Sequence, residues 1–199
     1  MKTIVFDLGG VLIDWNPRYL YTKIFAAEEE MEWFLRTVCP PAWNARQDAG
    51  RPFAEGIAEA KEKYPAYAPQ IEAYFSRWNE MLGGPVKGTA QLLREIKSRG
   101  HKIYALTNWS AETFPLACAK FSFLNEFDGI LVSGEEKLAK PDPAIFKRLL
   151  ERFNLIAPDC VFIDDNLDNV AAAAELGFET VLFKDAPSLR RELVERGVL

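Results

Sequence analysis

The sequence predicts an α/β fold, namely a Rossmann-like parallel sheet with helices on both faces and a small inserted helical cap domain. Short apolar runs alternate with amphipathic segments from residue 86 onward, which is typical of βαβ units and parallel sheets. One further apolar run, residues 4–6, is separated from the others by a long stretch of helical pattern. The length of 199 residues allows one domain with an insertion or two small domains.

The composition supports a globular chain with a sizeable core, because 49% of the residues are hydrophobic and 27% are charged. The net charge of −5 argues against a nucleic-acid partner. No apolar run approaches the ~20 residues that span a bilayer, and Asp7 interrupts the N-terminal apolar run where a signal peptide would continue. We therefore expect a cytoplasmic protein without a membrane partner, and both a monomer and a homodimer stay open.

Residues 4–6, Ile-Val-Phe, form the predicted first strand, and Asp7 follows it directly. Gly9 and Gly10 come next and predict a tight turn with a close backbone approach. Open α/β sheets bind their ligands at the carboxyl ends of their strands, so Asp7 is a candidate functional residue. The alternative is a loop aspartate in an Asx-turn.

Residues 16–83 differ in pattern and predict the helical cap, which leaves 1–15 and 84–199 as the α/β core domain. Prolines separate the predicted cap helices, and Gly83-Gly84-Pro85 closes the region. The apolar spacing predicts these helices at residues 19–25, 28–38, 53–63 and 70–82.

The second half of the chain alternates regularly between the two kinds of element. Strands are predicted at residues 102–106, 129–132, 160–163 and 180–183. Helices are predicted at residues 89–99, 111–120, 143–153, 169–176 and 188–196.

Polar side chains follow these strands. Thr107 and Asn108 come after the strand at 102–106 and could hold an oxyanion together with the free N–H groups of a helix. The alternative is an ordinary helix N-cap, for which Ser110 would suffice.

Lys140 lies between an alanine and Pro141 at a predicted helix entrance, where it could neutralise a carboxylate or a phosphate. Its alternative is a solvated surface lysine. Lys137 competes for the same role, but Pro141 restrains the backbone beside Lys140, which favours Lys140.

Asp164 and Asp165 follow the strand at 160–163, and two adjacent carboxylates there are unfavourable unless a cation or hydrogen bonds offset them. Mg²⁺ takes its ligands from one or two carboxylates, water and substrate phosphate. The alternative is that the aspartates cap the next helix. Capping accounts for the presence of one aspartate at this place better than for two in a row. Together with Asp7, these residues suit phosphoryl transfer through an aspartyl-phosphate.

Four segments of the chain, FDLGGVL, LTNWS, KPDP and FIDDNLDN, occur in the order of the four motifs of the haloacid dehalogenase superfamily and resemble them. The resemblance covers the whole chain, with the helical insertion at the early cap position. Within this superfamily, the chain is most similar to the small phosphatase-like branch whose first motif reads D-L-G-[GN]-V.

The resemblance implies that Asp7 is the nucleophile and also a Mg²⁺ ligand. It implies that Thr107 and Asn108 bind the transferring phosphoryl group and that Lys140 stabilises its charge.

For the metal, the resemblance implies Asp165, with Asp164 as a further candidate, and the backbone carbonyl of Gly9. Gly10 is a candidate substrate contact beside the nucleophile. In the cap, polar and aromatic side chains suit a sugar-like ligand. We take Arg46 as the first candidate of a group that also contains Trp43, Asn44, Gln47, Asp48 and Arg51. The alternative for Trp33, Trp43 and Trp78 is that they form the core of the cap.

The sequence departs from the family at Gly9, where most phosphatases of the family carry a second aspartate as general acid and base. Such a group commonly contributes ~10²–10⁴ in rate. Three explanations stay open: a good leaving group, another proton donor such as Asp14 or a cap residue, or slow or lost catalysis. Asp14 can also be read as part of a turn and helix cap.

The predicted function is a Mg²⁺-dependent phosphatase for a small phosphorylated metabolite, with sugar phosphates among the candidates. The alternatives are a 2-haloacid dehalogenase-type hydrolase, which needs no metal, and a catalytically weak phosphate-binding homologue. The pair Asp164-Asp165 favours Mg²⁺, and hence phosphate, over the dehalogenase.

Overall fold

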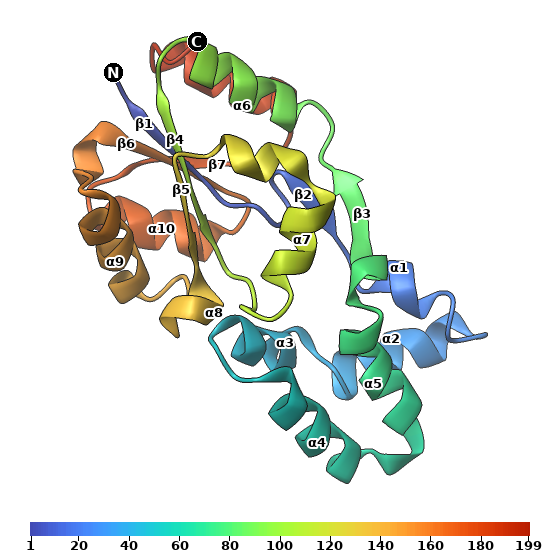
Figure 1. The fold of residues 1–199 in the computed structure, drawn as a ribbon. Helices are drawn as coiled ribbons and strands as arrows, with labels where there is room; N and C mark the ends of the chain where they lie inside the picture. Colours follow the sequence, from blue (N-terminus) through green and yellow to red (C-terminus); the bar gives the residue numbers. More distant parts are fainter.

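A five-stranded sheet forms the centre of the protein, whose structure is a computed structural model that describes residues 1–199 (Figure 1). The strand order is β5-β4-β1-β6-β7, and all neighbouring pairs are parallel. The strands are β1 (Thr3–Phe6), β4 (Lys102–Thr107), β5 (Gly129–Val132), β6 (Cys160–Asp164) and β7 (Glu179–Leu182). The predicted α/β fold is therefore confirmed, with β1 as the middle strand.

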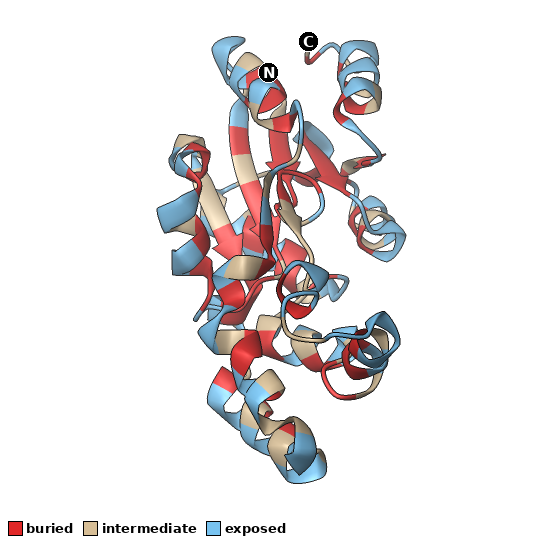
Figure 2. Ribbon diagram, turned by 90° about the vertical axis from the view of Figure 1, so that its right-hand side faces the viewer, coloured by how far each residue is buried: buried red, intermediate tan, exposed pale blue.

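Helices cover both faces of this sheet, because side chains on β1 alternate between two apolar clusters. Val5 belongs to the cluster on one face and Phe6 to the cluster on the other. The Val5 face is covered by α9 (Pro143–Phe153) and α10 (Leu167–Glu175), and the Phe6 face by α6 (Thr89–Ser98), α7 (Phe114–Lys120) and α11 (Ala186–Glu195). Most residues of the inner strands β1, β4 and β6 are accordingly buried, and the exposed residues lie on the outer sides of the helices (Figure 2).

A second, two-stranded antiparallel sheet pairs β2 (Ile13–Trp15) with β3 (Leu82–Pro85). This sheet was not predicted from the sequence, because Leu-Gly-Gly-Pro is a poor strand sequence. Asp14 pairs with Gly84, so the chain leaves the core and returns to it along two adjacent strands.

Between β2 and β3, five α-helices form a separate helical region below the sheet in Figure 1. They are α1 (Arg18–Tyr21), α2 (Glu28–Thr37), α3 (Pro41–Asp48), α4 (Phe53–Lys63) and α5 (Ala68–Ser76). Aromatic packing holds them together, with Tyr21 and Phe34 at 4.9 Å between ring centroids and Tyr74 beside them. The assignment of residues 16–83 to a separate cap domain stays a prediction.

Several predicted helices differ in extent. The helix predicted over residues 70–82 ends at Ser76, and a 3₁₀ turn (Trp78–Met81) leads into β3. The helix predicted over residues 19–25 is the single turn α1.

Two helices of the structure were not predicted from the sequence. In α3, Pro41 occupies the first helical turn, where proline is compatible with a helix, so Pro40-Pro41 marks a start rather than a break. The other is α8 (Ser133–Glu136), a single turn directly after β5. No helix of the structure has the length and apolar character needed to cross a membrane.

Candidate active site

Three of the candidate residues follow adjacent strands and therefore lie at one edge of the sheet. Asp7 follows β1, Thr107 ends β4 and Asp164 ends β6. Since β4 and β6 flank β1 in parallel, their carboxyl ends bring these residues together.

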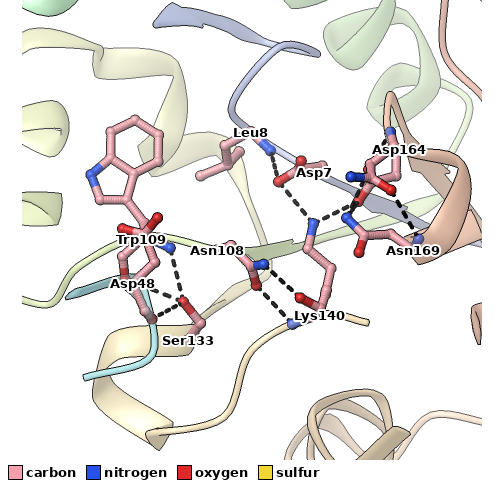
Figure 3. A network of polar contacts seen from close by, with 10 residues as sticks. Asp7, Leu8, Asp48, Asn108, Trp109, Ser133, Lys140, Asp164 and Asn169 are labelled. Atoms are coloured by element: carbon pink, nitrogen blue, oxygen red, sulfur yellow. Dashed lines mark hydrogen bonds and ion pairs between the residues drawn. The ribbon is translucent and has the colours of Figure 1, made fainter. Parts of the chain in front are cut away.

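Lys140 comes to the same place from the loop between α8 and α9. Its Nζ lies 3.0 Å from Oδ1 of Asp7 and 2.6 Å from Oδ2 of Asp164, and its side chain has no exposed surface (Figure 3). Lys137, the competing lysine, ends α8 with a left-handed backbone and contacts Gly50 instead. The structure thus brings Lys140 to the candidate nucleophile and leaves Lys137 outside the site.

Further donors hold Asp164 in place. The Asn166 backbone N–H donates to Oδ1 at 2.8 Å, and the side-chain amide of Asn169 lies 3.1 Å from both carboxylate oxygens. Both oxygens of Asp164 therefore already accept hydrogen bonds from the protein. In Asp7, Oδ1 accepts from the Leu8 N–H at 2.7 Å and Oδ2 accepts none. That leaves Oδ2 of Asp7 available for a ligand or an electrophile.

The buried charges at this site are unbalanced. Burial raises the pKa of Asp7 to about 7, with Asp164 adding to the effect and Lys140 opposing it. Burial acts to lower the pKa of Lys140, but Asp7 and Asp164 outweigh it and raise that pKa. A single ammonium group thus faces several carboxylates, so a second cation would favour the ionised form of Asp7.

A divalent cation fits the carboxylates present. Asp7, Asp164 and Asp165 each offer an oxygen atom within 4.8 Å of the others. Asp165 is exposed, and Gly10 leaves room for it: a Cβ on Gly10 would lie 2.1 Å from Oδ2 of Asp165. Carboxylate oxygens are the ligands that Mg²⁺ prefers, so this donor set suits that ion, with Asp7 and Asp165 as the oxygen donors that remain free.

Asn108 has a role that the sequence analysis missed. Its Oδ1 accepts from the Lys140 N–H at 2.8 Å, and its Nδ2 donates to the Lys140 carbonyl at 2.9 Å. The amide therefore positions the backbone that carries Lys140, and its predicted phosphoryl contact stays a prediction. The hydroxyl of Thr107 is buried without a partner, which leaves it free to donate to a bound anion.

A cavity of about 200 Å³ opens beside Asp7. It is lined by Asp7, Gly9, Trp15, Asn44, Asp48, Trp78, Asn108 and Trp109. The sequence carried no signal for the three tryptophans, because they come from separate segments that meet only in the folded chain. Asp14 does not line this cavity, and its Oδ2 accepts from the Tyr19 hydroxyl at 2.6 Å.

Only part of the predicted cap group reaches the site. Asn44 and Asp48 lie one turn apart on α3 and face the cavity. Arg46, two residues from each, lies on another side of α3, is exposed and pairs with Glu59 at 3.0 Å. The structure does not bring Arg46 to Asp7, which corrects its selection as the first cap candidate. Trp43 packs in the cap and donates from Nε1 to the Gly56 carbonyl at 3.1 Å.

The chain is similar to known hydrolases over most of its length. A family model described as haloacid dehalogenase-like hydrolase matches residues 1–177. A sesquiterpene phosphatase of Aspergillus oryzae is 28% identical, over 96% of this chain and 94% of its own. A D-ribitol-5-phosphate phosphatase of Bacteroides thetaiotaomicron is 24% identical, over 97% of both chains.

Solved structures share the fold. A HAD family enzyme of Bacteroides thetaiotaomicron, determined in complex with magnesium and inorganic phosphate, superimposes with a TM-score of 0.70. The two proteins are 27% identical in sequence, and the superposition covers 93% of this chain and 95% of that enzyme.

Proposed function

Because this chain belongs to the haloacid dehalogenase-like hydrolases, we propose that it is a Mg²⁺-dependent phosphatase acting on a small phosphorylated metabolite. The observation that carries the proposal is the site at the end of β1. There, Oδ2 of Asp7 is free, the carboxylate of Asp165 is within reach of the same cation, and the buried Lys140 ammonium contacts Asp7. Phosphatases among its relatives support the reaction class.

The residues divide the reaction between them. The Asp7 carboxylate attacks the phosphorus atom, and the ester P–O bond breaks with its electron pair on the leaving oxygen. Water then attacks the phosphorus, and the electron pair of the Asp7–phosphorus bond returns to the carboxylate as inorganic phosphate leaves. The Lys140 ammonium and the Thr107 hydroxyl offer positive charge and a hydrogen bond to the phosphoryl oxygens. When bound, Mg²⁺ supplies charge neutralisation and orientation of the phosphoryl group.

For the substrate, we propose a phosphorylated sugar or polyol. Trp15, Trp78 and Trp109 line the cavity together with Asn44 and Asn108. This lining combines apolar surface and hydrogen-bonding groups, which suits a polyol. The name of the ribitol-phosphate relative is in line with this choice.

A terpenoid phosphate is the second candidate, because three tryptophans lining one small cavity also suit an apolar leaving group. The sesquiterpene phosphatase relative points the same way. A screen that contains both polyol phosphates and prenyl phosphates decides between them by the ratio of kcat/KM values.

Hydrolysis of p-nitrophenyl phosphate with and without Mg²⁺ tests the reaction class. We expect hydrolysis that depends on Mg²⁺ and that Asp7→Asn abolishes, because the amide is not a nucleophile, while circular dichroism shows the same fold. Full activity of Asp7→Asn would rule out the mechanism. Chloride release from a 2-haloacid without metal would support the dehalogenase alternative, and turnover of neither compound would support a phosphate-binding protein.

A further inference from the structure

Asp48, the last residue of α3, lines the cavity that also contains Asp7 and Gly9. Its Oδ2 accepts from the Asn44 side chain at 2.9 Å. No lysine or arginine pairs with it. Asp48 is therefore a half-buried acid beside the candidate nucleophile, without a counter-ion.

The core domain holds this end of α3 in place. Ser133 Oγ donates to the carbonyl of Asp48 and accepts from the Trp109 N–H at 2.9 Å (Figure 3). Gly50 packs so closely that an added Cβ would lie 2.9 Å from Cγ of Lys137 and 3.2 Å from the Gly134 carbonyl. The backbone of Asp48 is thus fixed against α8, which in turn contacts the loop after β4.

At Gly9 the same cavity has no side chain that could donate a proton. Gly9 lies on the cavity wall, and a Cβ placed there would meet no atom within 4 Å. Asp7 and Gly9 therefore line a cavity in which Asp48 is the other acidic side chain.

We propose that Asp48, reaching the site from the helical cap, is the general acid and base of the phosphatase reaction, a role that rests on the function proposed above. In the first step the leaving oxygen keeps the electron pair of the broken P–O bond and takes the proton of the Asp48 carboxyl, so that an alcohol departs. In the second step the Asp48 carboxylate takes a proton from the water that attacks phosphorus. Inorganic phosphate leaves, Asp7 is free again and Asp48 is protonated for the next cycle.

The protonation of Asp48 agrees with this role. Burial raises the pKa of Asp48 to about 7. The negative charge of Asp7 also raises this pKa, and the backbone N–H of Ser110 acts to lower it. The Tyr74 phenol also faces Asp48 and holds its own proton, since burial raises the pKa of Tyr74 well above the usual value. A proton donor is most useful when its pKa lies near the working pH.

The test compares leaving groups in Asp48→Asn. β-Glycerol phosphate releases a poor leaving group, whereas p-nitrophenolate leaves without a proton. We expect the rate of the first step with β-glycerol phosphate to fall by a factor of about 10²–10⁴. With p-nitrophenyl phosphate we expect a retained burst of one p-nitrophenol per enzyme followed by slow turnover. Mass spectrometry during this phase should show one phosphoryl group on the enzyme.

Asp14→Asn is the matched control, since Asp14 is close in sequence to the site but does not line the cavity. We expect it to retain both activities. Introducing Gly9→Asp into Asp48→Asn should restore turnover of β-glycerol phosphate, because position 9 has room for the side chain. A purely structural role for Asp48 would not be rescued in this way.

Three results would overturn the proposal. The first is that Asp48→Asn loses the same activity on both substrates and gives no burst. The others are that Gly9→Asp restores no turnover, or that Asp14→Asn loses activity only on the substrate with the poor leaving group. These outcomes differ from failure of the proposed function. In that case the unmodified enzyme with Mg²⁺ would give no burst and no turnover of p-nitrophenyl phosphate.

Discussion

Lys140 shows how much of the site depends on single buried charges. Its ammonium group has no exposed surface and contacts Asp7 and Asp164 at 3.0 and 2.6 Å. Removing one partner of such a buried set leaves an uncompensated charge, which commonly costs about 3–5 kcal/mol. The same contacts orient Asp7, so stability and reactivity depend on the same atoms.

Gly10→Ala should weaken Mg²⁺ binding, because the new Cβ would lie 2.1 Å from Oδ2 of Asp165 and displace this ligand. We expect the Kd for Mg²⁺, measured by titration calorimetry, to rise by about 10–100-fold. Gly177→Ala is the control, since Gly177 has a similar positive φ of 87° but open space around its Cβ position. Equal Mg²⁺ affinity in Gly10→Ala and the unmodified protein would contradict the assigned metal position.

Asp48→Asn should make the protein more stable at alkaline pH. The folded-state pKa of Asp48 is raised to about 7, so its contribution to stability is complete below about pH 4 and is lost as the pH rises through 7. An amide cannot ionise, and we expect a gain of about 1–2 kcal/mol at pH 8, or roughly 3–6 °C in Tm. Calorimetry at pH 8 and pH 4 measures this gain in stability. An equal gain at both pH values would show that the ionisation of Asp48 is not its cause.

At the scale of elements, helix starts position the side chains of the site. The N-cap of α10 is Asn166, whose Oδ1 accepts from the Asp168 N–H at 2.8 Å and from the Asn169 N–H at 3.4 Å. Asn169 in turn donates to Asp164, which contacts Lys140. The first turn of α10 is thus connected to Lys140 through the side chains of Asn169 and Asp164.

Asn166→Ala should lose about 1 kcal/mol of stability, because the first turn of α10 loses its cap. We also expect kcat for p-nitrophenyl phosphate to fall, since Asn169 and Asp164 would shift. Asp185→Ala removes the N-cap of α11, which accepts from the Ser188 N–H at 2.7 Å far from the site. Urea unfolding should show similar losses for both variants, and equal kcat values in the two would refute the link to the site.

At the scale of the whole molecule, the helical region between β2 and β3 docks on the rest of the chain through a few close contacts. Besides the Ser133 contact to Asp48, the Phe53 N–H donates to the Glu112 carboxylate at 2.6 Å. Gly50 lies in the same interface, beside Lys137 of the core. These contacts set how far Asn44 and Asp48 extend into the cavity.

Gly50→Ala should reduce kcat/KM by about tenfold, because its Cβ would push α3 away from the core and small displacements of reacting groups are costly. The positive φ of 98° adds a strain of about 1–2 kcal/mol. Gly197→Ala is matched for strain, with a φ of 68° and no atom near its Cβ position. Steady-state kinetics should therefore separate the two variants, and Gly50→Ala should also lose more stability than Gly197→Ala, because it alone adds a steric clash to the backbone strain.

The sequence by itself determined the parallel sheet and the order of Asp7, Thr107, Lys140 and the Asp164-Asp165 pair. Local apolar periodicity marks strands, and parallel strands must end at the same edge of a sheet. These inferences need only neighbours along the chain and one rule of topology.

Only the tertiary structure decided what surrounds Asp7. It placed Asp48 rather than Arg46 in the cavity and assigned Asn108 to the backbone of Lys140. It also paired β2 with β3, although Leu-Gly-Gly-Pro has little strand preference. Such features depend on which face of a helix docks and on contacts between distant segments. No local pattern encodes them, because their free energy comes from partners that meet only after folding.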